Sequence, residues 1–295
     1  MLTKIYKFTE EELRKYTQLV AENAIRNLDN FEYENTRNTE TKSTRTFEND
    51  DDEKQMEILI IHMEKMTERK EHIEKTLEEI GLEPSHTYIT DGNPESFTQE
   101  ILDKYFGGKL ILYPKAENVT SCALKHFLAY EYIVRNNLEG ALILEDDICL
   151  HDDFMKTFYK SIKEYHQDAH DKQNVIISYE DSPLIFVPRS KRKKNQVLYS
   201  ADRNRCTGCY YINKSAAKAA LDDATTKKCR IAIDEYHTYL QKQGILDYLW
   251  CQPAIATQGS YNGMFKSQIS TKKDLMVKIR WFFKLNYKKL LYYFR

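Results

Sequence analysis

The chain has 295 residues, which is enough for one catalytic domain with extensions. Its 44 basic and 45 acidic residues nearly cancel to a formal net charge of −1, so no overall field favours nucleic acid, and we expect no nucleic-acid partner. The first residues lack the features of a secretory signal and no stretch reaches the roughly 18 apolar residues that span a bilayer, which predicts a cytoplasmic protein.

The N-terminal region divides into a helical and a polar part. Thr9 followed by Glu12 is typical of a capping box, and apolar residues continue from there at helical spacing. Residues 30–54 are almost wholly polar and lack an apolar period. We therefore expect three regions: an N-terminal helix and linker over 1–55, a catalytic domain over 56–271, and a tail over 272–295.

Strand and helix patterns alternate after Met56. The run EILIIHM predicts a buried strand, and TERKEHIEKTLEEI predicts a helix that Gly81 ends. This alternation indicates an α/β fold with a parallel sheet between helices. Further strands are expected near 87–90, 141–145, 174–178, 184–187 and 209–213, and further helices near 95–106, 121–136, 154–165 and 215–221.

The segment ALILEDDICL leads a buried strand directly into three carboxylates. In open α/β sheets, ligands bind at the carboxyl ends of the strands, and alternate residues of an extended chain point to the same side. Glu145 and Asp147 could therefore bind one ion, and oxygen ligands favour Mg²⁺ or Mn²⁺. The alternative is a solvated acidic turn that caps the next helix.

Two other segments hold candidate catalytic groups. His126 lies in a predicted helix among small and apolar residues, where a lone histidine is more often a core residue than a catalytic one. The run IAIDE ends in Asp234 and Glu235, either of which could accept a proton from a hydroxyl group. The alternative for this pair is a helix N-cap.

Six segments between Met56 and Ile269 form an ordered series. They are IIHMEKMTERKEH with Arg69, SCALKHF with Cys122 and His126, the LEDD of residues 144–147, TGCYYINKSAAKAAL, the Asp234–Glu235 pair, and QPAIATQGSYNGMFKSQI. This series resembles the motifs of glycosyltransferase family 25, the lipopolysaccharide and lipooligosaccharide glycosyltransferases that also include collagen galactosyltransferases. The chain departs from the family pattern at His62, where the family has asparagine, and at Ser121 and Lys125, where the family has Gly-Cys-x-x-Ser-His.

The resemblance implies a GT-A-type fold with a Rossmann-like, mostly parallel sheet. It also implies an inverting, metal-dependent transfer of galactose or glucose from a nucleotide-sugar donor, typically a UDP-sugar, to a glycan or glycolipid in lipopolysaccharide or surface polysaccharide synthesis. In this interpretation Glu145 and Asp147 bind Mn²⁺ or Mg²⁺, and Asp234 is the catalytic base with Glu235 beside it. The donor would be bound by His62, Arg69, His126, Asp146 and Gln258.

The C-terminal sequence KIRWFFKLNYKKLLYYFR predicts an amphipathic helix rich in lysine and aromatic residues. Its apolar stripe consists of Met276, Ile279, Phe283, Tyr287, Leu290 and Phe294. Such a helix favours a membrane interface with anionic lipids, so we expect a peripheral position on the inner face of the cytoplasmic membrane. The alternative is a helix docked on the protein's own core.

Two further patterns favour structural interpretations. Cys206 and Cys209 have the spacing of half a zinc site, but no second pair with a recognised spacing follows, and the six cysteines fit reduced thiols better than a disulfide framework. The basic run RSKRKK at 189–194 predicts a solvated loop that could contact an anionic acceptor.

Two other functions remain open on the sequence. An acidic cluster at a strand end is also typical of metal-dependent phosphoesterases, which would release phosphate without an acceptor. An inactive scaffold recruited to membranes would be insensitive to loss of Asp147.

Overall fold

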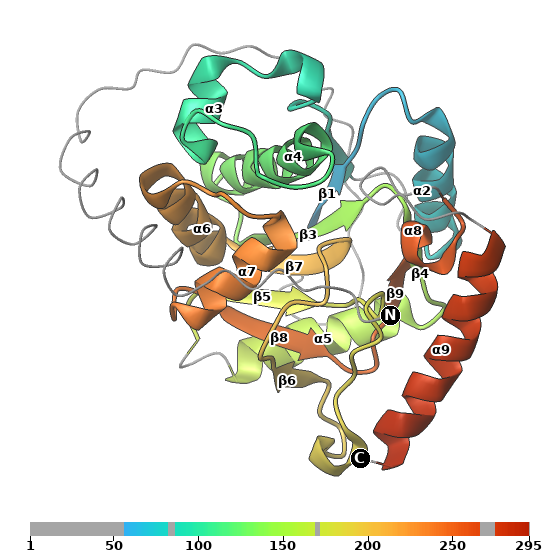
Figure 1. Cartoon of the computed structure of the whole chain (residues 1–295). Coiled ribbons are helices and arrows are strands. Elements are labelled where there is room, and N and C mark those ends of the chain that lie inside the picture. Colours follow the sequence, from blue (N-terminus) through green and yellow to red (C-terminus); the bar gives the residue numbers. More distant parts are fainter. Residues whose placement is uncertain (1–55, 82–85, 169–171, 266–274, 295) are drawn as a thin grey trace.

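A seven-stranded sheet forms the centre of the protein in the computed structural model, which describes residues 56–81, 86–168, 172–265 and 275–294. Strands β6 and β7 run antiparallel to their neighbours, and the other five strands share one direction. The predicted α/β fold with a mostly parallel sheet is therefore confirmed. The strands lie in the order β2 (His86–Ile89), β1 (Glu57–Ile61), β3 (Gly140–Glu145), β7 (Cys209–Asn213), β5 (Val175–Ser178), β8 (Asp247–Cys251) and β6 (Leu198–Ser200) (Figure 1).

Helices cover both faces of this sheet and create two separate cores (Figure 1). Alternate residues of β1 point to opposite faces, as period 2 requires, so that Leu59 and Ile61 join one core while Ile58 and Ile60 join the other. The first core lies under α3 (Gln99–Phe106), α4 (Ala116–Arg135), α6 (Lys214–Lys227) and α7 (Ile233–Lys242), and the second under α2 (Thr67–Glu79) and α5 (Phe154–Asp168).

A second, two-stranded sheet lies beside the first and pairs β4 (Ile148–Leu150) antiparallel with β9 (Ala256–Gln258). Because β4 follows β3 after a two-residue turn, this pairing brings the C-terminal part of the chain to the carboxyl end of β3. The short helix α8 (Gly259–Asn262) follows β9 directly.

Local capping explains several helix ends. The Thr98 hydroxyl accepts a hydrogen bond from the Ile101 N–H at 3.2 Å, and the Asn213 side chain accepts one from the Ala216 N–H at 2.9 Å, as N-caps do. Gly81 has a φ of 75° just after α2, so the predicted end of that helix is confirmed.

Residues 184–187, which were expected to form a strand, are irregular although three of them are buried. A left-handed φ of 57° at Leu184 breaks the extended backbone, so this prediction was wrong. The short helices η1 (Pro94–Ser96) and η3 (Arg189–Lys191) lie in loops. The predicted N-terminal helix, the linker over 30–54 and the boundary at 271 lie outside the described residues.

The C-terminal helix α9 (Leu275–Phe294) lies along the side of the protein and contacts α8 and η3 (Figure 1). The Tyr292 ring packs edge-on against Phe186, with 5.6 Å between centroids. Among the described residues, no helix has the length and apolar character needed to cross a bilayer.

Candidate active site at the carboxyl ends of the central strands

Three segments meet at one edge of the central sheet. Parallel pairing brings Ile61, the last residue of β1, beside Glu145, the last residue of β3. The antiparallel strand β7 begins at the same edge, where the Glu145 N–H donates to the Gly208 carbonyl oxygen at 2.8 Å. Strand β3 ends at Glu145, and Asp146 and Asp147 form a turn. The expected extended backbone through Asp147 was therefore wrong, because the chain reverses there into β4.

Asp146 is the centre of a buried ion-pair cluster. Its Oδ1 accepts a hydrogen bond from Arg69 Nη1 at 2.8 Å, and its Oδ2 accepts one from His62 Nδ1 at 2.8 Å. The guanidinium of Arg69 also lies over the Phe265 ring, 5.5 Å from its centroid. The structure thus brings together three of the predicted donor-binding residues, and both carboxylate oxygens of Asp146 already bond to protein groups.

Asp147 is 2% exposed and faces the start of α8. Its Oδ2 accepts a hydrogen bond from the Ser260 N–H at 3.1 Å and lies 3.5 Å from Arg69 Nη2, whereas its Oδ1 is buried without a hydrogen-bond partner. Burial raises the pKa of Asp147 to about 6, with Arg69 opposing the rise and Glu145 adding to it. Gly259 allows this approach, because a Cβ there would lie 2.9 Å from the Asp147 carbonyl oxygen.

Glu145 is held by two side chains from the second half of the protein. Thr207 Oγ1 donates to its Oε1 at 3.0 Å, and Gln258 Nε2 donates to its Oε2 at 2.8 Å. A Cβ at Gly208 would lie 2.6 Å from Gln258 Cγ, so glycine is needed beneath this amide. Gln258, which was predicted to bind the donor, is therefore a direct partner of Glu145.

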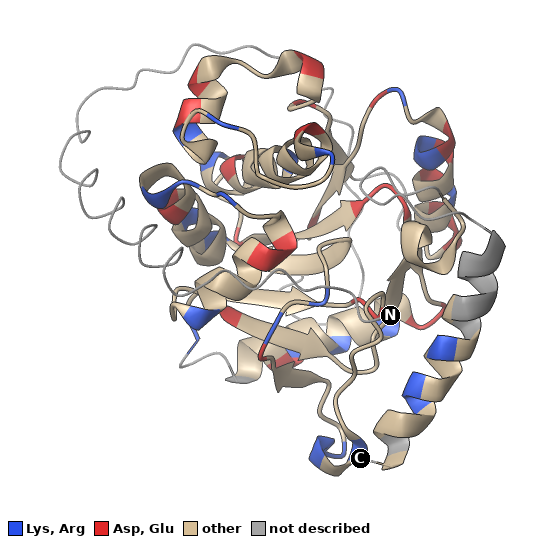
Figure 2. Ribbon diagram, viewed as in Figure 1, with Lys and Arg blue, Asp and Glu red and all other residues tan. Residues whose placement is uncertain are grey.

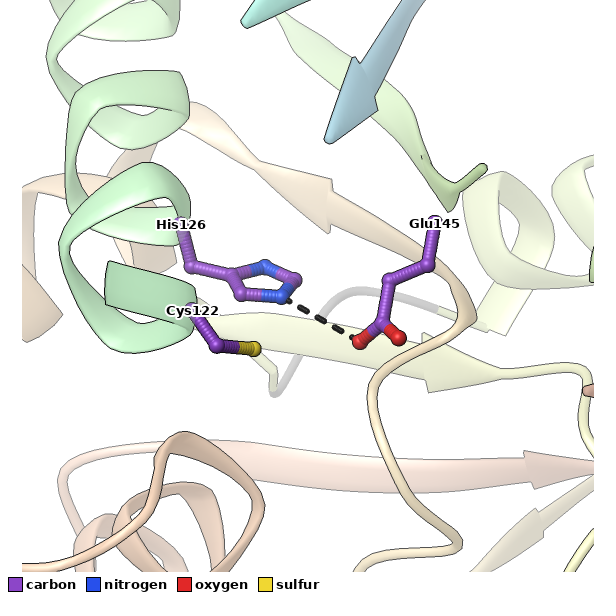
Figure 3. Close-up of side chains that lie close together, drawn as sticks. All are labelled: Cys122, His126 and Glu145. Carbon is purple, nitrogen blue, oxygen red and sulfur yellow. Dashed lines mark ion pairs between the residues drawn. The ribbon is translucent and has the colours of Figure 1, made fainter. Parts of the chain in front are cut away.

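His126 projects from α4 toward Glu145, with 3.5 Å between its Nε2 and Oε1 (Figure 3). Its other nitrogen, Nδ1, begins a buried hydrogen-bonded chain through Tyr210, Tyr130 and His237, with successive distances of 2.7, 2.8 and 2.7 Å. Burial lowers the pKa of His237 to about 3, so this end of the chain is a neutral imidazole. These hydrogen bonds hold the orientation of the His126 ring.

Cys122 lies one helical turn before His126 on the same helix, and its thiol points to the same space (Figure 3). Burial raises the pKa of this thiol well above its usual range, and the charges of Glu145 and Asp234 raise it further. One ligand atom from each of Cys122, His126 and Glu145 lies within 4.8 Å of the other two.

Asp234 and Glu235 lie in the first turn of α7, but the N-cap of this helix is Ala232, so the alternative interpretation of the pair as an N-cap was wrong. The Glu235 N–H donates to Asp234 Oδ1 at 2.9 Å, and the Asn204 side chain donates to the Asp234 carbonyl oxygen. Burial raises the pKa of Asp234, and the charge of Glu145 adds to this effect. Glu235 is exposed at the surface.

Glu180 is a buried carboxylate that the sequence interpretation missed. It follows β5, is 0% exposed, and accepts hydrogen bonds from the backbone N–H groups of Gly208 and Cys209. Burial raises the pKa of Glu180 well above its usual range. It orders the loop that carries Thr207. The sequence VIISYED contained the signal, because there too an apolar strand leads into carboxylates.

Lys125, which departs from the family pattern, has a structural position. Its Nζ donates to the carbonyl oxygens of His62, Thr90 and Asp91 at 2.5 to 3.1 Å, and the residue is 3% exposed. It therefore joins α4 to the carboxyl ends of β1 and β2, beside the ion-pair cluster of Asp146.

The amino-acid sequence over residues 55–237 matches a family model described as glycosyltransferase family 25 (LPS biosynthesis protein). A Drosophila melanogaster protein described as a glycosyltransferase 25 family member is 32% identical over 97 residues, which cover 31% of this chain and 16% of that protein. The chain thus matches only a small part of that relative's length.

Two solved structures show a distant likeness. One is a putative glucose-1-phosphate thymidylyltransferase from Bacillus anthracis, with 11% identity, a TM-score of 0.34, and coverage of 69% of this chain and 89% of that one. The other is a glycosyltransferase involved in glycosylation of the major capsid of PBCV-1, with 13% identity, a TM-score of 0.35, and coverage of 76% and 98%. TM-scores this low do not establish a shared fold.

Proposed function

We propose that this chain, which belongs to glycosyltransferase family 25, is an enzyme that transfers a hexose, galactose or glucose, from a UDP-sugar to a hydroxyl group of a glycan or glycolipid, with inversion. The observation that supports this most is the grouping of Glu145, Asp147 and Asp234 at the ligand-binding edge of the sheet, with raised pKa values at both aspartates. Synthesis of lipopolysaccharide or another surface polysaccharide is the proposed setting.

The carboxylates at the end of β3 supply the oxygen ligands that a hard divalent cation prefers. The Asp147 Oδ1 atom is buried without a partner, and the Glu145 carboxylate remains partly exposed, so each has an oxygen lone pair for Mn²⁺ or Mg²⁺. Such an ion, when bound, neutralises charge on a leaving diphosphate. A bound cation would lower the raised pKa of Asp147, because a nearby cation favours the ionised form of a buried carboxyl group.

Arg69 and His62 form the proposed donor side of the site. The guanidinium stays cationic, because the charges of Asp147 and Asp146 outweigh the burial that acts to lower its pKa. A fixed arginine can bind phosphate oxygens in a bidentate manner. His62, bonded to the same Asp146, keeps the ion pair in position, while Gln258 and His126 orient Glu145.

Asp234 is the proposed base. It lies in the first turn of α7, and its charge interacts with that of Glu145, so it is near the carboxylates that follow β3. Attack opposite a leaving group requires a base on the acceptor side, and Asp234 is the residue we assign to that role. A raised pKa makes it a stronger base than an ordinary aspartate once it is ionised. It removes the proton of the acceptor hydroxyl as that oxygen bonds to the anomeric carbon.

Helix α9 supports a lipid-linked acceptor at a membrane surface. Phe283, Tyr287, Leu290 and Phe294 are 57% to 78% exposed on one face of the helix. The basic helix η3 contacts α9, so the lysines of α9 and the basic loop at 189–194 lie on one side of the protein (Figure 2). Each basic residue near an anionic bilayer contributes about 1 kcal/mol. We propose that this side faces the inner surface of the cytoplasmic membrane.

Product analysis tests this proposal. Purified enzyme is incubated with UDP-galactose or UDP-glucose and a panel of glycan acceptors, and the anomeric configuration of the product is read by NMR. We expect UDP release that depends on acceptor, with the β-linked product that inversion of an α-linked donor gives. A retained configuration would rule out the single-displacement role of Asp234. Phosphate release without acceptor would indicate a phosphoesterase instead.

A further inference from the structure

Cys122, His126 and Glu145 converge from helix α4 and the end of strand β3 on one small space (Figure 3). A thiol, an imidazole and a carboxylate are the three ligand types that zinc sites combine. The i, i+4 spacing of Cys122 and His126 puts both on one face of the helix, and Glu145 approaches from the sheet.

The Nε2 atom of His126 is the strongest indication of a ligand. The residue is 0% exposed, and this nitrogen is buried without a hydrogen-bond partner. It points at Glu145 Oε1 from 3.5 Å, which is too far for a hydrogen bond of normal strength. A buried nitrogen in this state costs free energy unless something binds it.

We propose that Cys122, His126 and Glu145 bind a borderline divalent cation of the Zn²⁺ or Co²⁺ type, with a fourth coordination position open. Tetrahedral zinc sites have bond lengths of about 2.0 to 2.3 Å, which put neighbouring ligand atoms roughly 3.3 to 3.8 Å apart. The 3.5 Å between His126 Nε2 and Glu145 Oε1 lies in this range. All three ligand atoms lie within 4.8 Å of one another, so small side-chain rotations would bring them to coordination distance. Cys122 and Glu145 are partly exposed, so an ion can enter.

The hydrogen-bonded chain behind His126 is a suitable outer support for the ion. Metal-binding histidines commonly donate their second N–H to a fixed partner, and here Nδ1 bonds to Tyr210 at 2.7 Å. An ion on Nε2 requires the proton on Nδ1, so Tyr210 then donates to Tyr130, and Tyr130 donates to His237 Nε2. His237 can accept because its pKa of about 3 keeps it neutral.

If the chain is the proposed transferase, an ion in this site should inhibit it. This one expectation rests on the proposed function. Glu145 belongs both to this site and to the proposed Mn²⁺ or Mg²⁺ site, so a thiophilic ion would withdraw it from donor binding. Zn²⁺ should then inhibit transfer, and raising the concentration of Mn²⁺ should relieve the inhibition only in part, because Mn²⁺ does not prefer thiolate.

Cobalt absorption spectroscopy tests the site without any reaction. Full-length protein freed of metal with a chelator is titrated with Co²⁺, with Zn²⁺ as the competitor. We expect a thiolate-to-cobalt charge-transfer band that Zn²⁺ removes and that is absent in Cys122→Ser. Cys149→Ser, which changes a half-buried thiol on β4, is the matched control and should keep the band.

A second variant separates metal binding from folding. Tyr210→Phe removes only the hydroxyl that supports His126, and loss of such outer partners weakens metal affinity roughly 10- to 100-fold. The proposal is overturned by a wild-type spectrum without a thiolate band, by a band that survives in Cys122→Ser, or by unchanged affinity in Tyr210→Phe with a wild-type melting curve. If the cobalt band is present but no donor supports transfer, the proposed function would be refuted and the metal site would stand.

Discussion

The guanidinium of Arg69 donates a hydrogen bond to the Asp146 carboxylate at 2.8 Å and thereby joins helix α2 to the turn after strand β3. The same guanidinium lies 3.5 Å from Asp147, so one cation balances two buried acidic groups. We expect loss of this charge balance to lower both the stability of the protein and its activity.

Arg69→Met should lower the free energy of unfolding by about 3 kcal/mol at pH 8, because it leaves buried carboxylates without their cation. The loss should be smaller at pH 5, where Asp147 is largely protonated. Urea unfolding followed by circular dichroism measures both values. Arg135→Met is the control, since its side chain is 62% exposed, and it should change stability by less than about 1 kcal/mol. Equal effects of the two variants would contradict this.

Asp147 should make the protein less stable as pH rises from about 4 to 6. Its pKa in the folded state is about 6, against an ordinary value of 3.8, so in this window the unfolded chain ionises while the folded protein keeps the proton. The folded protein binds more protons, and the free energy of unfolding therefore falls with rising pH, by about 3 kcal/mol from this group. Asp147→Asn should remove this part of the pH dependence.

The control for that titration is Asp152→Asn, which changes an exposed carboxylate in the adjoining segment. It should keep the wild-type dependence of stability on pH. Other buried carboxyl groups with raised pKa values, such as Glu180, contribute in the same direction in all variants, so the difference between profiles isolates Asp147. Superimposable profiles for wild type and Asp147→Asn would show that Asp147 is ionised normally.

Asp234→Asn should lower kcat by roughly 10²- to 10⁴-fold with little change in donor KM, because it removes a base and not a donor contact. Glu235→Gln, at the adjacent exposed position, should cost far less. Burial and Glu145 raise the pKa of Asp234, so wild-type kcat/KM should fall on the acid side at a pH above the ordinary range of aspartate. Steady-state kinetics across pH would reject this role if Glu235→Gln were the more damaging change.

The double substitution Phe283→Ser and Leu290→Ser should weaken binding to vesicles of anionic phosphatidylglycerol. Both side chains are exposed on the outer face of α9, at 68% and 57%, so the fold should tolerate the change. Leu112→Ser is the control, because Leu112 is 93% exposed on the loop between α3 and α4, away from α9. Co-sedimentation that is equal for all three proteins would exclude α9 as the lipid-binding element.

The sequence predicted the strands and helices that depend on local hydrophobic patterns. The positions of β1, β3, β5 and β7 followed from apolar runs. The family resemblance assigned His62, Arg69 and Asp146 to the donor, and the structure places these three side chains in contact. The α/β fold with a mostly parallel sheet is confirmed.

Long-range pairing explains what the sequence could not predict. Gln258 bonds to Glu145 across 113 residues, and only the pairing of β4 with β9, two three-residue strands, brings them together. The burial of Glu180 likewise depends on β7 lying between β3 and β5. Neither a hydrophobic period nor a sequence motif predicts such contacts, because they depend on which strands pair and in which register.

The proposed metal-dependent donor site is tested most directly by the binding and turnover of a panel of nucleotide sugars. Wild type and Asp147→Ala are compared with Mn²⁺, with Mg²⁺ and with chelator. We predict that one donor, a UDP-hexose, is turned over only with a divalent cation, and that Asp147→Ala abolishes this turnover while remaining folded. Binding of no donor under any condition, or equal turnover by wild type and Asp147→Ala, would show that the carboxylates after β3 do not form a metal-dependent donor site.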